Sequence, residues 1–302
     1  MAASVRSALV TAAAILCVPS AALAQSKGPS QPTDLPNETV KANTATKGNT
    51  DIAKGGFVSS SRPEDEDPKH VNDVSIGAGG LFASGNARTV ALTTVTKTRF
   101  RRDENQFSGA AAINYGRAGK KGEQIDSTVE NYQGLLRYDY YITDDVSLFL
   151  QTTGRRDKFQ GLDLRLNIDP GVAYYFINEK KHRLQGEIGY DFQYDIRRDE
   201  DLVPKAGGPA VDKTQTLHNL RLFLGYENKL RKEVSFISSI EYLQNFADLE
   251  KFRFIADIGL KSNVADHLAV ATTYTARYEN KPLPDVSQLD SIASFNLVYT
   301  LF

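Results

Sequence analysis

The stretch HRLQGEIGYDFQYDI, residues 182–196, alternates polar and apolar side chains with a period of two. Glu187 and Asp195 stand at odd positions, whereas Ile188 and Phe192 stand at even positions. This alternation predicts a β-strand with one polar and one apolar face. Because ordinary strands average roughly five or six residues, we infer an environment that favours long strands with charge on one side.

The N-terminal residues 1–24 have the features of a secretory signal peptide. Arg6 is their only charged residue, the apolar stretch ALVTAAAILCV follows it, and the small-residue motif ALA at 22–24 ends the segment. The only cysteine, Cys17, also lies here. The sequence therefore predicts a secreted chain whose mature form has no thiol or disulfide chemistry.

Residues 25–70 differ in composition from the rest of the chain. Pro, Gly, Ser, Thr, Asn and charged residues dominate, which predicts a disordered tail on the periplasmic side. The whole chain has 36 Lys and Arg residues against 37 Asp and Glu residues, and this balance argues against nucleic-acid binding. Beyond the signal, no apolar run reaches the roughly 18 residues of a transmembrane helix.

From Val71 onward, period-two runs follow one another to the C-terminus with no convincing helix between them. The absence of crossover helices predicts an antiparallel sheet. The predicted strands are 71–83, 88–101, 105–117, 128–141, 146–156, 163–177, 182–196, 215–229, 234–246, 251–261, 267–279 and 289–302.

The connections between these runs alternate in length. Short ones, such as RRDEN at 101–105 and TDD at 143–145, alternate with longer ones, such as GRAGKKGEQIDST at 116–128, GRRDKFQGLD at 154–163 and the segment 197–214. Tight periplasmic turns and longer outer loops are typical of transmembrane barrels. This asymmetry predicts that both termini are periplasmic.

The number of strands indicates which face points inward. About eight strands enclose a space that side chains can fill, but twelve enclose a wider one. An apolar lining would leave that space empty or require a large ligand, so we expect the apolar face to meet lipid and the polar face to line a wet interior. Lipid also requires closure, because a free strand edge would expose unsatisfied amides. The predicted fold is all-β: a transmembrane antiparallel β-barrel over 71–302.

Odd-numbered positions then line the lumen. The predicted lumen-lining residues are Arg137, Asp139, Arg165, Asp169, Arg183, Glu187, Asp191, Asp195, Arg221, Glu227, Glu241, Arg253, Asp257, Lys261, Arg277 and Glu279. Two alternatives stay open for them. They flank a water-filled passage for small polar solutes, or they pair across the lumen and seal a structural barrel.

No motif predicts catalysis, a cofactor or a metal site. His218 is the only histidine near the longer loops, and no serine stands at a spacing that suggests a nucleophile beside it. A barrel lipid hydrolase is therefore the weakest alternative, and we expect no enzyme. The stretch RRDED at 197–201 could bind a divalent cation or a lipopolysaccharide phosphate, but a solvated loop is the favoured interpretation.

The chain ends on SFNLVYTLF, and its terminal Phe302 resembles the signal by which outer-membrane barrels contact the barrel-assembly machinery. One departure stands out: Phe302 has the opposite parity to the apolar face formed by Phe295, Leu297 and Tyr299. The expected partners are thus this machinery, outer-membrane lipid and lipopolysaccharide.

Four stretches carry a family resemblance: SGN at 84–86, RYDYYITDDVSLF at 137–149, RDKFQGLDLRLNIDPGVAYYFI at 156–177 and HRLQGEIGYDF at 182–192. With them the chain resembles the salt-induced outer-membrane protein family, whose domain has no assigned function. The resemblance implies a Gram-negative outer-membrane barrel and a link to osmotic stress. It implies no catalytic residue and no ligand.

Overall fold

A computed structural model describes residues 69–83, 87–120, 124–203, 209–282 and 287–301 of the chain. The predicted signal peptide, nearly all of the predicted tail and Phe302 lie outside these residues. The strands are β1 (His70–Ala83), β2 (Ala87–Arg102), β3 (Asn105–Lys120), β4 (Asp126–Tyr141), β5 (Val146–Asp157), β6 (Leu162–Asn178), β7 (His182–Arg197), β8 (Thr214–Lys229), β9 (Val234–Asn245), β10 (Phe252–Ala265), β11 (Leu268–Glu279) and β12 (Leu289–Thr300).

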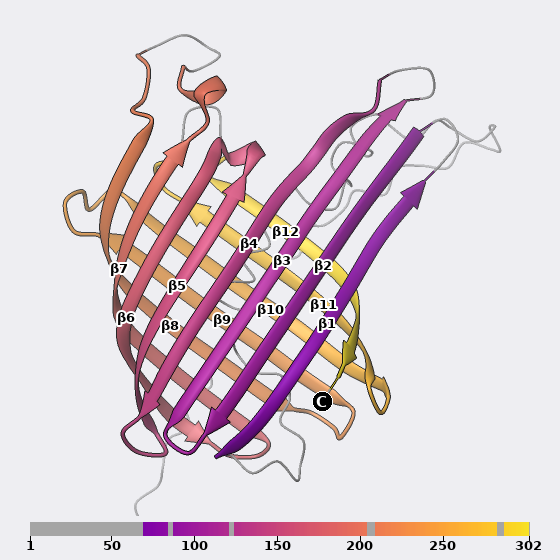
Figure 1. The fold of residues 1–302 in the computed structure, drawn as a ribbon, viewed down its shortest axis with the longest axis vertical. Coiled ribbons are helices and arrows are strands. Elements are labelled where there is room, and N and C mark those ends of the chain that lie inside the picture. Colours follow the sequence, from indigo (N-terminus) through magenta and orange to yellow (C-terminus); the bar gives the residue numbers. More distant parts are fainter. Residues whose placement is uncertain (1–68, 84–86, 121–123, 204–208, 283–286, 302) are drawn as a thin grey trace, which may run out of the picture. The chain divides into compact units, whose positions relative to one another are not determined.

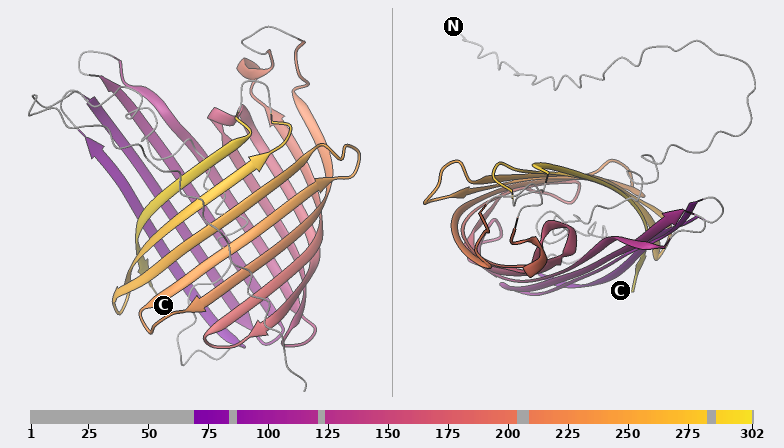
Figure 2. Two further views of the ribbon diagram at one scale, coloured as in Figure 1. Left: turned by 180° about the vertical axis from the view of Figure 1, so that it is seen from behind. Right: turned by 90° about the horizontal axis from the view of Figure 1, so that it is seen from above.

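These strands form one closed barrel in which each strand pairs antiparallel with its neighbours in sequence (Figure 1). The ring closes where β1 pairs with β12, over Ser75–Ala78 and Leu297–Thr300. Seen from above, the strands surround a common interior (Figure 2). The predicted all-β, twelve-stranded antiparallel barrel is confirmed.

The two ends of the barrel differ in their connections. At the end that holds the C-terminus (Figure 1), β-hairpins turn over 103–104, 142–145, 179–181, 230–233 and 266–267. At the other end, the longest connections run over 198–213 and 280–288. We call this second end the mouth of the barrel. The predicted alternation of short and long connections is present, although not at every mouth connection.

Two predicted loops were wrong in extent. β3 and β4 continue to Lys120 and from Asp126, so most of 116–128 is paired strand. β5 and β6 are joined only by the short 3-10 helix η1 (Lys158–Gln160) and Gly161. Backbone hydrogen bonds between strands need no apolar side chains, so the strands continue through polar residues whose sequence predicted a loop.

The turn after β5 shows how so few residues reverse the chain. The Asp157 carboxylate accepts hydrogen bonds from the backbone N–H groups of Phe159 and Gln160, at 3.1 and 3.2 Å. Gly161 then adopts a left-handed conformation with φ 66°, which glycine reaches without steric cost. These two features bring η1 in over the mouth.

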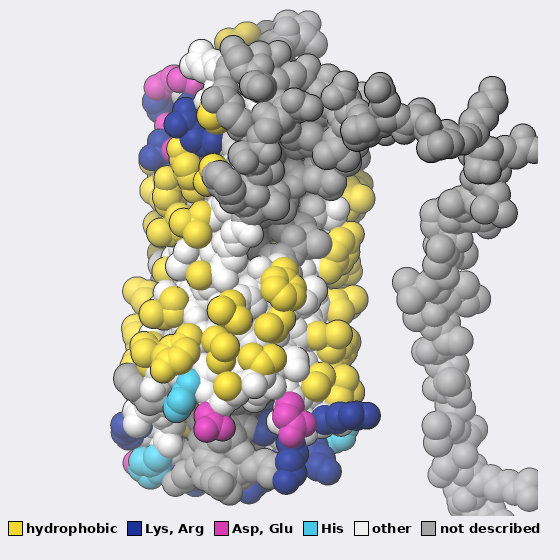
Figure 3. Space-filling model, turned by 90° about the vertical axis from the view of Figure 1, so that its right-hand side faces the viewer, with side chains coloured by type: hydrophobic (Ala, Val, Ile, Leu, Met, Phe, Trp, Pro, Cys, Tyr) yellow, Lys and Arg dark blue, Asp and Glu magenta, His cyan; other side chains and the backbone are white. Residues whose placement is uncertain are grey.

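The two faces of the wall differ as the alternation predicts. In β7, Glu187 is 5 % exposed and its neighbour Ile188 is 56 % exposed. Exposed apolar side chains form a band between charged ends on the side shown in Figure 3. Among the described residues no helix is long and apolar enough to span a membrane. A closed ring with an apolar outer face and a polar inner face is the architecture of an outer-membrane β-barrel.

Exposed aromatic side chains lie near both ends of the outer face. Tyr138 and Phe176 stand near the short turns, whereas Tyr132 and Tyr190 stand nearer the mouth, and all four are more than a third exposed. Aromatic girdles at the two membrane interfaces are a property of such barrels.

Candidate functional site

The inner face of the barrel holds the sixteen residues predicted to line the lumen. Four of them are half-buried: Arg183, Asp257, Lys261 and Glu279. The other twelve are buried, with at most 7 % of the residue exposed: Arg137, Asp139, Arg165, Asp169, Glu187, Asp191, Asp195, Arg221, Glu227, Glu241, Arg253 and Arg277. Their charges are therefore held inside the ring of strands, away from the apolar outer face.

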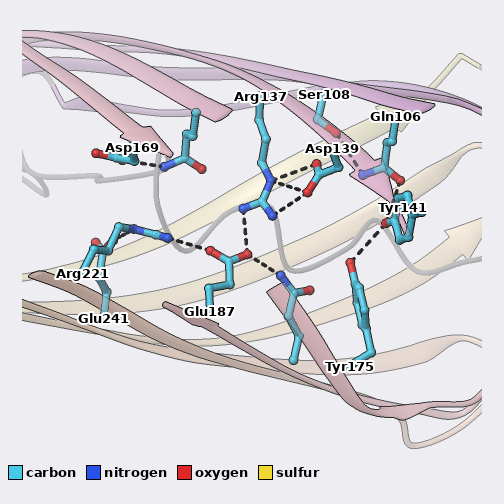
Figure 4. A network of polar contacts seen from close by, with 12 residues as sticks. Gln106, Ser108, Arg137, Asp139, Tyr141, Asp169, Tyr175, Glu187, Arg221 and Glu241 are labelled. Carbon is cyan, nitrogen blue, oxygen red and sulfur yellow. Dashed lines mark hydrogen bonds and ion pairs between the residues drawn. The ribbon is translucent and has the colours of Figure 1, made fainter. Parts of the chain in front are cut away.

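Five of these residues form one network, which we call the ion-pair bridge: Arg137, Asp139, Glu187, Arg221 and Glu241 (Figure 4). Arg137 on β4 donates to Asp139 and to Glu187 on β7, both at 2.7 Å. Arg221 on β8 donates to Glu187 at 2.7 Å and to Glu241 on β9 at 2.5 Å. Because β5 and β6 stand between β4 and β7 in the ring, the bridge passes across the inner faces of both.

The inward aromatic ring of Phe149 packs against both arginines of the bridge. The Cζ atoms of Arg137 and Arg221 lie 4.2 and 5.6 Å from the ring centroid of Phe149 on β5, within the range of cation–π contacts. Gly171 stands opposite Phe149 on β6, and a Cβ atom there would lie 2.5 Å from the ring. Glycine is thus required for the ring to lie in this position.

Sequence reasoning missed Phe149 as part of the site. The one available signal is its parity: Phe149 is a large apolar residue at an inward, odd position of β5, and it is 4 % exposed. Its pairing with a glycine becomes visible only once the register of β5 and β6 is known.

Two other buried carboxylates, Asp191 and Asp169, accept hydrogen bonds from neighbouring strands of the wall. Asp191 accepts hydrogen bonds from Asn167 and Asn219, both at 2.6 Å, and these lie on the two neighbouring strands. Asp169 accepts one from Gln151 on the adjacent β5, at 3.1 Å. These contacts tie neighbouring strands together.

Nearer the mouth lies a cavity of about 200 Å³, which we call the mouth cavity. Its walls include Arg165, Asp195, Arg197, Arg253 and Glu279. Arg165 forms a two-pronged ion pair with Asp195, at 2.8 and 2.7 Å. Arg253 lies 3.4 Å from Glu279, a longer contact. The cavity therefore holds both paired and weakly paired charges.

Two loop segments bound the mouth. Arg277 on β11 donates to the side-chain oxygen of Gln160 in η1, at 3.4 Å, so a contact joins distant parts of the ring. Lys281 lies 2.6 Å from Glu250 and 3.2 Å from Asp248. Its hydrogen bonds to Glu250 and then to Asp248 raise the pKa of Lys281.

The segment RRDED at 197–201 is not a single solvated loop. Arg197 is the last residue of β7, is 8 % exposed and lines the mouth cavity. Only Arg198 and the short 3-10 helix η2 (Asp199–Asp201) belong to the connection that follows. The odd parity of Arg197, continuing that of β7, was the signal for its inward direction.

The described residues provide no metal cluster and no inward catalytic histidine. No group of three or more His, Cys, Asp or Glu residues among them could hold a metal ion. His218 is exposed on the outer side of β8, where it hydrogen-bonds the hydroxyl of Tyr190 and contacts the ring of Phe192. It therefore faces away from the barrel interior.

Three solved structures illustrate what the chain resembles. The porin NanC has a TM-score of 0.43 at 11 % identity, over 77 % of this chain and 99 % of that chain. The COG4313 outer membrane channel from Pseudomonas putida F1 has a TM-score of 0.44 at 8 % identity, over 78 % and 99 %. The porin KdgM, in complex with disordered oligogalacturonate, has a TM-score of 0.39 at 7 % identity, over 76 % and 98 %. Likenesses this distant carry no inference about function.

No curated protein matches the chain. A family model does match: DUF481, described as a protein of unknown function, covers residues 76–301. The salt-induced name of the resembling family stays a prediction. Since the match spans most of the barrel, the chain belongs to the DUF481 family.

Proposed function

We propose that the protein is an outer-membrane channel that gives passive, non-enzymatic passage to small polar solutes. The observation that carries this proposal is the inner face, which bears polar and charged side chains along the strands and holds the mouth cavity. A wall that only had to fill its interior could do so with apolar residues at less desolvation cost.

The same proposal assigns the surroundings. The apolar outer face contacts lipid, and the mouth connections face lipopolysaccharide on the outside of the cell. The short turns and both termini are periplasmic, and the C-terminal strand contacts the barrel-assembly machinery. The proposed link to salt stress rests on sequence resemblance, and measuring the amount of this protein in cells shifted to high salt tests it.

A closed structural barrel is the second candidate, and the ion-pair bridge favours it. Arg137, Glu187, Arg221 and Glu241 are each at most 6 % exposed and joined at 2.5–2.7 Å. A bridge of this kind narrows the interior between β4 and β7. Under the channel proposal it acts as a constriction, and under the alternative it contributes to a seal.

Single-channel conductance in a planar bilayer distinguishes the two. If the bridge is a constriction, wild-type protein conducts and Glu187→Ala conducts more, because the link between Arg137 and Arg221 is lost. Asp191→Ala is the matched control: it removes a buried carboxylate of the same strand that accepts hydrogen bonds from Asn167 and Asn219 on the two neighbouring strands. If the wild type, Glu187→Ala and Asp191→Ala all fold and insert into the bilayer but pass no current, the barrel is closed.

A further inference from the structure

The mouth cavity differs from the rest of the interior in its charge. Five basic side chains line it: Arg165, Arg197, Lys251, Arg253 and Lys281. The lining carboxylates are Asp195 and Glu279. The cavity is therefore lined by more positive than negative charge, although the chain as a whole is close to neutral.

The ion pairs inside the cavity leave part of this charge uncompensated. Asp195 is taken up by the two-pronged contact with Arg165. Arg197 has no ion pair within the described residues; it donates to the backbone oxygen of Asp212 and to the side chain of Gln215, at 2.6 and 2.5 Å. Arg253 has only long contacts, 3.4 Å to Glu279 and 3.5 Å to Gln193.

Two guanidinium N–H groups at this cavity are also unused. The Nε atoms of Arg197 and Arg253 are buried and have no hydrogen-bond partner among the described residues. Both residues are more than nine-tenths buried. Buried donors are nearly always satisfied in folded proteins, and a charged donor that lacks a partner carries a large desolvation cost. Because both arginines line the cavity, an acceptor bound there would satisfy these donors once the guanidinium groups turn toward it.

The charges around Arg253 also favour a bound anion. Arg165 and Arg277 repel Arg253, against the attraction of Glu279 and Asp195, whereas at Arg197 the attraction of Asp195 and Asp212 exceeds the repulsion of Arg165. An anion among them would relieve this repulsion and offer acceptors in the geometry that guanidinium groups prefer.

We propose that the mouth cavity binds a small organic anion through a carboxylate or phosphate group held by Arg197 and Arg253. The cavity lies on the inner side of the wall, so the ligand is a free solute and not the headgroup of a lipid in the surrounding membrane. The role of this anion site rests on the proposed channel function, and the site adds to that proposal the anionic class of the solute. Binding itself needs no open lumen.

Titration calorimetry on the full chain, folded in detergent micelles at low salt, tests the site. Citrate and inorganic phosphate are the probes and glucose is the neutral comparison. We expect saturable binding of citrate, none of glucose, and affinity at least about tenfold weaker for Arg197→Gln and for Arg253→Gln, since each loses a charge-assisted hydrogen bond. Arg156→Gln is the matched control, because Arg156 is exposed on the outer side of β5.

Several results would overturn the inference. The first is that folded wild-type protein does not bind citrate. The second is that the citrate affinity of Arg197→Gln and of Arg253→Gln equals that of the wild type. If neither variant folds, the salt dependence of the wild type tests the site. Its citrate affinity should fall steeply as salt rises from about 0.01 to 0.3 M, because screening weakens charge attraction. An affinity that stays constant over this range refutes the site. Displacement of citrate by dispersed lipopolysaccharide would assign the cavity to a lipid phosphate and overturn the free-solute part.

The binding and conductance results separate the two proposals. Citrate binding without current retains the anion site and rejects the channel. Current without citrate binding retains the channel and rejects the anion site.

Discussion

The ion-pair bridge and the mouth cavity are built from the same residue types in different proportions. In the bridge, two arginines face three carboxylates, and every member has an ion pair at 2.5–2.7 Å. In the cavity, basic residues outnumber carboxylates, and Arg253 reaches its carboxylate only at 3.4 Å.

This difference separates structural charge from charge that can bind a ligand. A buried cation with a close carboxylate is compensated, and its removal harms the fold. A buried cation without one keeps donors for a solute. The position of each carboxylate, and not the number of charges along the strand, thus decides what an inward arginine does.

The largest expected effect comes from cutting the bridge. Glu187→Ala leaves Arg137 and Arg221 buried without their shared partner, at a cost on the order of 3–5 kcal/mol in the free energy of unfolding. Asp195→Ala removes a carboxylate partner of Arg165 in the cavity, where water or an anion can replace it, so we expect a loss of about 1.5–3 kcal/mol.

Urea unfolding of both variants, with and without added citrate, measures the contrast. Citrate bound at the intact cavity should stabilise the wild type and Glu187→Ala by the same amount, and it should stabilise Asp195→Ala by more, because it also takes the place of the lost carboxylate. Equal losses in the two variants, with citrate adding the same stability to both, would show that the two regions do not differ in access to solutes.

A second prediction compares the inner and outer faces at the bridge itself. Ile188 follows Glu187 on β7 and points outward. Ile188→Arg places a charge in lipid, at roughly 2–4 kcal/mol if it lies near the midplane. Gln185→Arg adds the same charge on the inner side, beside Glu187, and should cost much less. Unfolding in lipid vesicles measures both, and a smaller loss for Ile188→Arg would reverse the assignment of faces.

The packing beneath the bridge gives a third prediction. Gly171→Ala puts a methyl group 2.5 Å from the Phe149 ring and 2.6 Å from the Ile188 carbonyl oxygen. Overpacking of this kind costs about 1–3 kcal/mol. Gly154→Ala on β5 is the control, since nothing lies within 4 Å of the added atom. If both variants unfold at the same urea concentration, Phe149 does not depend on the glycine.

Strand number and facing could be predicted from the sequence because both follow from local periodicity. The alternation of residues 182–196 shows which side chains share a face without any knowledge of neighbouring strands. β7 occupies His182–Arg197, close to the predicted 182–196. The same reasoning placed Arg137, Glu187 and Arg221 on the inner face.

Pairing within the interior could not be predicted in this way. Arg137 and Glu187 meet across two intervening strands, 50 positions apart in sequence, and that contact depends on the shear and width of the ring. The predicted strand 105–117 also ended short of β3, which continues to Lys120, because polar residues near the mouth resemble a loop although their backbones still pair. Arg197 was assigned to a loop for the same reason.

The smallest expected effect tests whether uncompensated donors or total charge decide binding at the mouth. Lys281 lines the cavity as Arg253 does, but Glu250 and Asp248 hold its ammonium group, and all three side chains are at least a third exposed. Charge that is already paired and screened by solvent contributes little to a nearby anion. We therefore expect Lys281→Gln to weaken citrate binding by no more than about twofold, against tenfold or more for Arg253→Gln. Calorimetry under identical salt compares the two. An equal loss in both variants would mean that the cavity attracts anions by its net charge alone, and that the unused Nε donors of Arg197 and Arg253 have no part in recognition.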